Sequence, residues 1–123
     1  MHNNVVKRYK EAWENHDVVI LASLFHKDIR YQEHSDNLII GIDALIAYWN
    51  RNSKKQTDVI FTPSRVFSAQ TEIVVHWDAK FFELKKKELI FLEGIMWLTL
   101  EGGLIINLIE FFERKQHEPE RKI

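Results

Sequence analysis

Residues 89–112 read LIFLEGIMWLTLEGGLIINLIEFF, and this stretch decides the fold. On either side of its centre it is rich in β-branched and aromatic residues, which suit a pleated, half-buried surface. At the centre lies Glu101-Gly102-Gly103, whose glycines can adopt the positive φ of a tight hairpin turn. The stretch therefore predicts two long antiparallel strands, Leu89–Leu100 and Leu104–Phe112.

Two further strands are predicted upstream, Val59–Val66 and Ile73–Phe82, because both have the same β-branched and aromatic composition. The turn residues Ser68–Thr71 separate them, and Lys85–Lys87 form the tip of the next hairpin. Pro63 cannot donate a hydrogen bond to a strand ladder, so it indicates a sheet edge or a β-bulge. The second half of the chain is therefore predicted to be an antiparallel meander of four strands.

The first half of the chain has a helical period instead. Residues 3–16 place apolar and charged side chains on opposite faces, at the spacing of an amphipathic helix. Asp17 is a suitable N-cap for a shorter second helix that ends near His26 and Lys27. A third helical pattern follows Gly41 and is made by Ile42, Leu45, Ile46 and Trp49.

Between the second and third helices, Ile29, Tyr31 and Glu33 alternate with Arg30 and Gln32, which predicts a short strand that runs into a loop. Helices followed by a meander indicate an α+β fold in which one face of the sheet covers the helices. Apolar residues also occur at successive strand positions, which point to opposite faces of the sheet, as in Phe81-Phe82 and Phe111-Phe112. Since this pattern suggests that another subunit covers the outer face, we expect a homodimer.

Composition narrows the range of partners. The 123 residues fit a single domain, 1–123. A net charge of -1 supplies no strong field for nucleic acid or anionic lipid, and no apolar run is long enough for a membrane span or a signal peptide. The absence of cysteine removes thiolate chemistry and fits a cytoplasmic location. Without a phosphate loop, dinucleotide fingerprint or nucleophile elbow, we expect no cofactor.

Several short segments resemble the SnoaL-like branch of the nuclear transport factor 2-like superfamily, in the order in which that family has them. They are Ala12-Trp13, Leu24-Phe25, Gly41, Glu93-Gly94-Ile95, Gly102-Gly103-Leu104-Ile105 and Glu110-Phe111-Phe112-Glu113, with Leu104 where the family usually has Lys. The resemblance implies a cone-shaped, curved antiparallel sheet packed on three N-terminal helices around an apolar pocket. The superfamily includes ketosteroid isomerase, scytalone dehydratase, limonene epoxide hydrolase and polyketide cyclases, so membership alone sets no reaction.

The resemblance to ketosteroid isomerase implies two catalytic positions. Tyr9 falls where that family has its oxyanion-stabilising tyrosine, and Glu33 falls where it has its catalytic base. Ile95 would occupy the place of a third group, a neutral carboxylic acid, and it cannot donate a hydrogen bond. The alternative is that Tyr9 is an ordinary residue of an amphipathic helix and that Glu33 is a solvated carboxylate.

Glu110 is a third catalytic candidate, and it comes from the strand pattern alone. Alternation places it on one face of the last strand with Ile106, Leu108 and Phe112, an otherwise apolar row. A carboxyl group that faces an apolar pocket has a raised pKa, which suits a general acid. The alternative is that this face meets solvent or a partner subunit.

Aromatic residues supply the expected walls of the pocket. Helix faces and strand parity place the ligand contacts at Trp13, Phe25, Tyr31, Trp49, Trp77, Trp97, Leu108 and Phe112, although each of these could equally be plain core. Aromatic walls favour a small apolar molecule as the partner. His34 and Asp36 are close enough in sequence to bind a metal together, but no HxH or HExxH spacing supports a metal site and we expect none.

These features predict a small-molecule pocket protein with Tyr9, Glu33 and Glu110 as its polar contacts. As an enzyme it would be a cofactor-independent isomerase, cyclase or dehydratase that uses proton transfer. The alternative is a non-catalytic ligand-binding or dimerisation module. A closed cavity with convergent polar groups favours the enzyme, and a collapsed interior favours the module.

Overall fold

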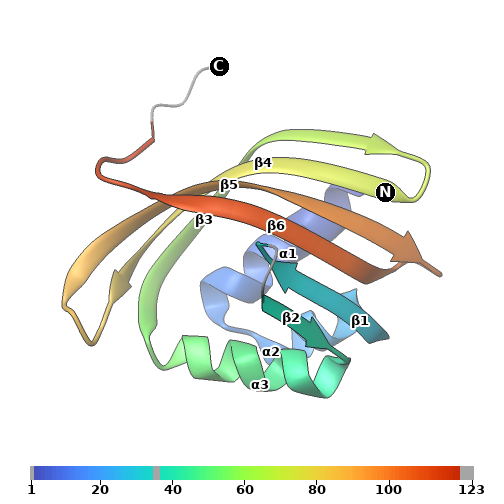
Figure 1. The fold of residues 1–123 in the computed structure, drawn as a ribbon, viewed down its shortest axis with the longest axis horizontal. Helices are drawn as coiled ribbons and strands as arrows, with labels where there is room; N and C mark the ends of the chain where they lie inside the picture. Colours follow the sequence, from blue (N-terminus) through green and yellow to red (C-terminus); the bar gives the residue numbers. More distant parts are fainter. Residues whose placement is uncertain (1, 35–36, 120–123) are drawn as a thin grey trace.

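The computed structural model describes residues 2–34 and 37–119, and Figure 1 shows a curved sheet arched over three helices. In chain order the elements are α1 (His2–Asn15), α2 (Val18–Leu24), β1 (Phe25–Glu33), β2 (Asn37–Ile40), α3 (Ile42–Ser53), β3 (Gln56–Ala69), β4 (Glu72–Glu83), β5 (Glu88–Glu101) and β6 (Leu104–Lys115). The predicted α+β class is confirmed. Within the described ranges, no helix is long and apolar enough to cross a membrane.

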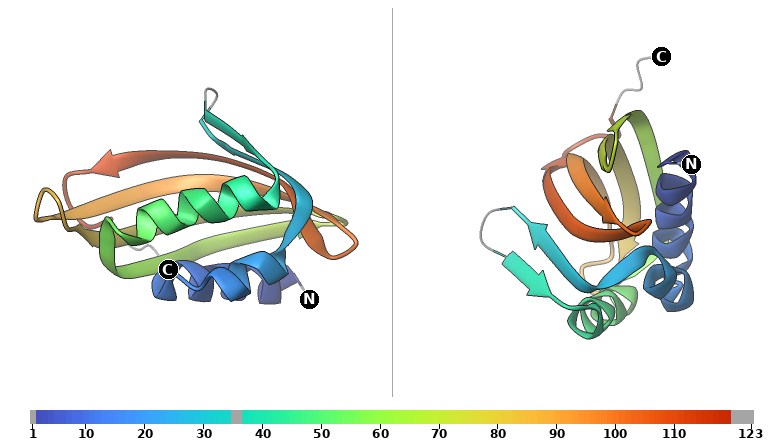
Figure 2. Two further views of the ribbon diagram at one scale, coloured as in Figure 1. Left: turned by 90° about the horizontal axis from the view of Figure 1, so that it is seen from below. Right: turned by 90° about the vertical axis from the view of Figure 1, so that its right-hand side faces the viewer.

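The strands form one sheet in the order β2-β1-β6-β5-β4-β3. The four long strands β3 to β6 form the predicted antiparallel meander. β3 lies at the edge of the sheet and its register shifts between Pro63 and Arg65, as the proline indicated. The bends in these long strands give the sheet its curved, unclosed shape (Figure 2).

The first strand departs from the expected antiparallel sheet, because β1 pairs with β6 in parallel. A parallel pair needs a long crossover connection, and here everything from β2 to β5 lies between the two strands in sequence. The sheet is therefore mixed. A strand that was not predicted follows, since Asn37–Ile40 forms β2 and pairs antiparallel with β1.

The helices cover the concave face of the sheet (Figure 2). Val6, Tyr9 and Ala12 form the buried stripe of α1, in agreement with its helical period. Asp17 caps α2 as predicted, because its carboxylate accepts hydrogen bonds from the backbone N–H groups of Val19 and Ile20 at 3.0 and 3.1 Å. The second helix ends at Leu24, earlier than expected, because the next residue is already extended and begins β1.

Candidate active site

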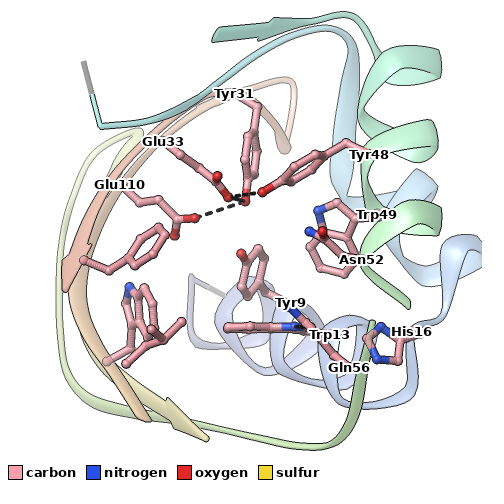
Figure 3. Close-up of a pocket in the computed structure, with 13 residues that line it drawn as sticks. Tyr9, Trp13, His16, Tyr31, Glu33, Tyr48, Trp49, Asn52, Gln56 and Glu110 are labelled. Carbon is pink, nitrogen blue, oxygen red and sulfur yellow. Dashed lines mark hydrogen bonds between the residues drawn. The ribbon is translucent and has the colours of Figure 1, made fainter. Parts of the chain in front are cut away.

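A pocket of about 130 Å³ lies between the concave face of the sheet and the helices (Figure 3). Aromatic rings make most of its wall. Polar groups gather around Glu33 and Glu110 on one side, and around His16 and Gln56 on the other (Figure 3). The residues that line it are Tyr9, Trp13, His16, Tyr31, Glu33, Tyr48, Trp49, Asn52, Gln56, Trp77, Leu92, Glu110 and Phe112. The interior is therefore not collapsed: it contains a cavity onto which polar groups converge, and this arrangement favours chemistry over the non-catalytic module.

Two carboxyl groups meet at one wall because of the parallel pairing of β1 and β6. The register of this pair sets Glu33 directly beside Glu110. Tyr31 lies two residues before Glu33, on the same face of β1, and its hydroxyl points at the carboxyl groups (Figure 3). The unexpected strand pairing is thus what assembles the site.

Two tyrosine hydroxyls hold this carboxyl pair. The Tyr31 hydroxyl lies 3.1 Å from Glu110 Oε1 and 3.4 Å from Glu33 Oε2, so the shorter contact is its main hydrogen bond. The Tyr48 hydroxyl donates to Glu33 Oε2 at 2.6 Å from the opposite wall, which α3 provides. Figure 3 shows these bonds converging on the two carboxyl groups.

Burial dominates the electrostatics of this cluster. Glu110 is only 5% exposed, and this burial raises its pKa to about 8, with a further increase from the charge of Glu33 and the hydrogen bond between the two groups. The hydrogen bond from Tyr31 acts in the opposite direction. Near neutral pH, Glu110 therefore carries a proton and is a hydrogen-bond donor.

The tyrosines stay neutral for the same physical reason. Burial raises the pKa of Tyr9 and of Tyr31 well above the ordinary value of 10.0, and the charge of Glu110 adds to both shifts. Burial likewise raises the pKa of Tyr48. Tyr9 stands on α1 with its hydroxyl directed toward the carboxyl pair (Figure 3). Its ring is fixed edge-on against Trp49 at a centroid distance of 5.8 Å.

Most of the predicted site residues meet at this pocket. The three catalytic candidates line it together with Trp13, Tyr31, Trp49, Trp77 and Phe112. Phe25 and Leu108 are buried in the core but do not line the pocket, although the Phe25 ring packs 6.5 Å from that of Tyr31. They support the wall and are not placed to contact a ligand.

Trp97 does not lie where it was predicted. Its neighbours Met96 and Leu98 are fully buried, so alternation turns Trp97 to the outer face of the sheet, where it is 48% exposed. Its indole N–H donates to the Glu72 carboxylate at 2.9 Å. The prediction that Trp97 points into the pocket was therefore wrong.

The predicted place of Ile95 is wrong for the same reason. Ile95 is 50% exposed on the outer face, and its buried neighbours Gly94 and Met96 are the ones that face inward. Met96 pairs with Glu110 across the two strands. The buried carboxyl group of this site is therefore supplied by β6 and not by β5.

Four polar lining residues were not predicted as site residues: His16, Tyr48, Asn52 and Gln56. Helical spacing could have identified two of them, because Tyr48 and Asn52 follow Leu45 and Trp49 along the buried side of α3. His16 lies one residue beyond the end of α1 and has a φ of +49°, so helical spacing does not give the direction of its side chain. Gln56 begins β3, and no sequence signal marks it.

Of the two residues considered together for a metal, His34 and Asp36, Asp36 lies outside the described residues. His34 packs its ring against those of Phe111 and Phe112, at centroid distances of 5.9 and 4.7 Å. In the ranges 2–34 and 37–119, no three His, Asp or Glu side chains come together as metal ligands would.

Comparison with known proteins confirms the resemblance. Residues 6–108 match the family of SnoaL-like domains, whereas no curated protein sequence matches the chain significantly. A candidate SnoaL-like polyketide cyclase from Shewanella denitrificans OS-217 has a TM-score of 0.81 at 15% identity, with 90% of this chain and 89% of that chain covered.

Two other solved structures have the same fold. A hypothetical protein with a ketosteroid isomerase-like fold from Catenulispora acidiphila, solved with trimethylamine, has a TM-score of 0.78 at 16% identity, covering 86% of this chain and 82% of that chain. An LEH-like epoxide hydrolase from M. tuberculosis has a TM-score of 0.79 at 12% identity, covering 89% and 80%. At such identities the likeness shows the fold alone.

Proposed function

Because the chain belongs to the SnoaL-like domain family, we propose that it is a cofactor-independent enzyme that moves a proton on a small molecule held in this pocket. One observation carries the proposal: a carboxyl pair, the buried Glu110 and the half-buried Glu33, stands at the wall of an aromatic pocket and shares a tyrosine hydroxyl. Two carboxyl groups with different surroundings are a common way to provide a base and an acid in one site.

The roles follow from the surroundings of each group. Glu33, as a carboxylate, takes a proton from a carbon next to a carbonyl group and returns it to another position of the same molecule. Glu110 is protonated near neutral pH and donates a hydrogen bond to the oxygen on which negative charge develops. Tyr9 is neutral and faces the pair, so its hydroxyl is the second candidate donor. Isomerisation, cyclisation and dehydration all begin with removal of such a proton; in a dehydration the proton leaves with the departing hydroxyl group as water.

The proposal is tested by following exchange of carbon-bound hydrogen for deuterium in D₂O by NMR. Suitable probes are cyclohex-3-enone, 2-tetralone and a Δ5-3-ketosteroid, which differ in size but share an acidic C–H group. We expect the protein to accelerate exchange for at least one probe, and Glu33→Gln to lower that rate about 100-fold or more. Glu93→Gln is the control, because Glu93 pairs with His76 outside this pocket.

Two outcomes would contradict the proposal that the protein is a proton-transfer enzyme with Glu33 as its base. Equal exchange rates for the wild type and Glu33→Gln would exclude Glu33 as the base. Probes that bind, as judged by a rise in melting temperature, without any exchange would favour the alternative, a non-catalytic ligand-binding module.

We also propose that the protein is a homodimer joined through the outer face of the sheet. Ile95 and Phe111 pair across β5 and β6, and with Trp97 they leave a patch of large apolar side chains about half exposed. Patches of this kind on a folded domain mark interaction surfaces. A second copy of the chain would cover the patch without exposing new apolar surface.

Light scattering with size-exclusion chromatography tests the dimer. We expect a mass twice the 14.7 kDa of the chain, and the 14.7 kDa mass for the double variant Ile95→Glu/Phe111→Glu. Val19→Glu is the control, since Val19 is an isolated exposed apolar residue on α2, and it should remain dimeric. A monomeric wild type would refute the proposal, as would a double variant that stays dimeric.

A further inference from the structure

The carboxyl pair of the pocket has no positively charged partner within the described residues. Neither Glu33 nor Glu110 forms an ion pair there with a Lys, Arg or His side chain. Neutral hydroxyl groups, those of Tyr31 and Tyr48, hold the two carboxyl groups instead. Taking a charge out of water is costly unless it is paired. The half-buried Glu33 carboxylate therefore favours a positively charged group in the pocket.

The rest of the wall supplies no such charge. Among the lining residues in the ranges 2–34 and 37–119 there are two glutamates and no Lys or Arg. His16 also lines the pocket, but burial lowers its pKa, so its ring is neutral near pH 7. The Arg51 guanidinium lies over the Tyr48 ring, 5.9 Å from its centre, and Arg51 does not line the pocket. An anionic ligand would meet repulsion here, and a cation would meet attraction.

Aromatic rings enclose the space beside this carboxylate. The aromatic lining residues are Tyr9, Trp13, Tyr31, Tyr48, Trp49, Trp77 and Phe112. The rings of Tyr9 and Trp49 meet at an interplanar angle of 84°, and those of Trp13 and Trp77 meet at 81°. In Figure 3, Tyr9, Tyr48 and Trp49 stand around the same space as the two carboxyl groups.

Walls of this composition suit an organic cation. The face of a tyrosine or tryptophan ring carries partial negative charge and attracts a cation, most strongly where water is excluded. Aromatic cages of this kind recognise quaternary ammonium groups. A methylated ammonium ion would also cover apolar wall with its methyl groups, which a hydrated metal ion would not do. The aromatic rings and the Glu33 carboxylate thus favour the same kind of ligand.

The cavity also limits the size of the ligand. Its volume of about 130 Å³ is close to the ~150 Å³ cavity that accommodates benzene, and well below the roughly 300–1,000 Å³ of pockets for larger ligands. A trimethylammonium group with a short chain is of this size. A steroid or another fused-ring molecule is not.

We propose that the substrate is a small organic cation, a methylated ammonium ion with a carbonyl group on a short chain, whose charge lies between the Glu33 carboxylate and the aromatic rings. This inference rests on the proposed function and adds a substrate class to it. The ammonium group has a second effect, because it stabilises the negative charge that develops when Glu33 removes a proton from the carbon between the ammonium and the carbonyl group.

A matched pair of probes tests the proposal by calorimetry at pH 7. The cation (2-oxopropyl)trimethylammonium and the neutral ketone 4,4-dimethylpentan-2-one have the same shape, and they differ in one atom, a charged nitrogen or a carbon. We expect the wild type to bind the cation at least about tenfold more tightly. Glu33→Gln should lose most of this preference, because glutamine keeps the shape of the side chain without its charge. Glu93→Gln, outside the pocket, should keep it.

A second variant tests the aromatic wall. Phe112 lines the pocket, is half-buried and has no hydrogen-bonding group in its side chain. Phe112→Leu removes the ring and keeps an apolar side chain, so it should weaken binding of the cation about threefold and change binding of the neutral ketone little. Equal weakening for the two probes would show that the ring contributes contact area only, and would overturn its part in cation binding.

The wild-type protein alone decides the substrate class. Equal affinities for the two probes, tighter binding of the neutral ketone, or no binding of the cation at millimolar concentration would overturn it, whether or not the variants fold. Deuterium exchange at the carbon between the two groups, measured above the rate in buffer, separates this inference from the enzyme. A tenfold preference without faster exchange of either probe would refute the enzyme and leave the cation site standing. Faster exchange of the neutral ketone without a preference for the cation would do the reverse.

Discussion

Replacing Glu110 with glutamine is expected to increase the free energy of unfolding by about 3 kcal/mol at pH 7 and to remove the part of its pH dependence between 4.5 and 8 that comes from Glu110. Glutamine has the shape of the protonated carboxyl group. It can still accept the hydrogen bond from Tyr31 and donate one to Glu33. The variant therefore keeps the contacts of the native acid. It cannot ionise, so it avoids the free energy that the wild type loses by keeping this carboxyl group protonated at pH 7.

The sign of this effect follows from where the proton is bound. The pKa of Glu110 is about 8 in the folded protein, compared with an ordinary value of 4.5. Below pH 4.5 both the folded and the unfolded chain hold the proton. As the pH rises toward 8, the unfolded chain releases it while the folded protein keeps it, so stability falls by about 1.4 kcal/mol per pH unit. Above pH 8 the loss levels off.

Urea unfolding of the wild type and Glu110→Gln from pH 4.5 to 9 measures the difference directly. Glu11→Gln, on the exposed side of α1, controls for the loss of one surface charge. The stability gain should be accompanied by a lower proton-transfer rate, because the glutamine amide is a weaker hydrogen-bond donor to the developing negative charge than the carboxylic acid is. Parallel pH dependences for the wild type and Glu110→Gln would show that Glu110 has no raised pKa.

Replacing Gly94 with alanine is expected to lower the free energy of unfolding by about 3 kcal/mol, and valine should be worse. A Cβ atom at this position would lie 2.4 Å from the backbone oxygen of Phe111 and 2.7 Å from the Cβ of Phe112. Neither atom can move aside by a side-chain rotation. β5 and β6 would have to separate, and β6 carries Glu110 two residues away from Phe112.

The control for Gly94 is Gly102→Asn in the β5–β6 turn. Gly102 has a φ of +59°, which asparagine tolerates, and a Cβ atom there would meet nothing within 4 Å. Thermal and urea unfolding should show a change below about 0.5 kcal/mol for this variant. A Gly94→Ala protein as stable as the wild type would mean that the strand separation seen here adjusts freely.

The elements of the fold could be predicted because local patterns determine them. Helical period identified α1 and α3, the Asp17 cap identified the start of α2, and residues 89–112 identified the last hairpin. Strand alternation says which residues share a face, but not which strand lies alongside. The parallel pairing of β1 with β6 depends on tertiary contacts and not on local sequence. The spacing of residues along the chain therefore could not show that Glu33 and Glu110 lie side by side.

The site was predicted where a residue is chemically out of place and missed where it is ordinary. Glu110 stood out as the carboxyl in an apolar row, and in the structure it is buried and lines the pocket. Trp97 was misplaced because apolar residues occupy both faces of β5, so composition did not distinguish inside from outside. His16 and Gln56 come from a helix end and a strand start, and only the folded chain brings them to the pocket.

The claim that Glu110 holds a proton at neutral pH supports both the acid role and the stability prediction, and a ¹³C NMR titration of Glu-labelled protein tests it most directly. We predict one side-chain carboxyl resonance that titrates near pH 8 and is absent from Glu110→Gln. If every glutamate carboxyl titrates below about pH 5.5, within the ordinary range for this side chain, Glu110 is ionised at neutral pH and the account of the site is contradicted.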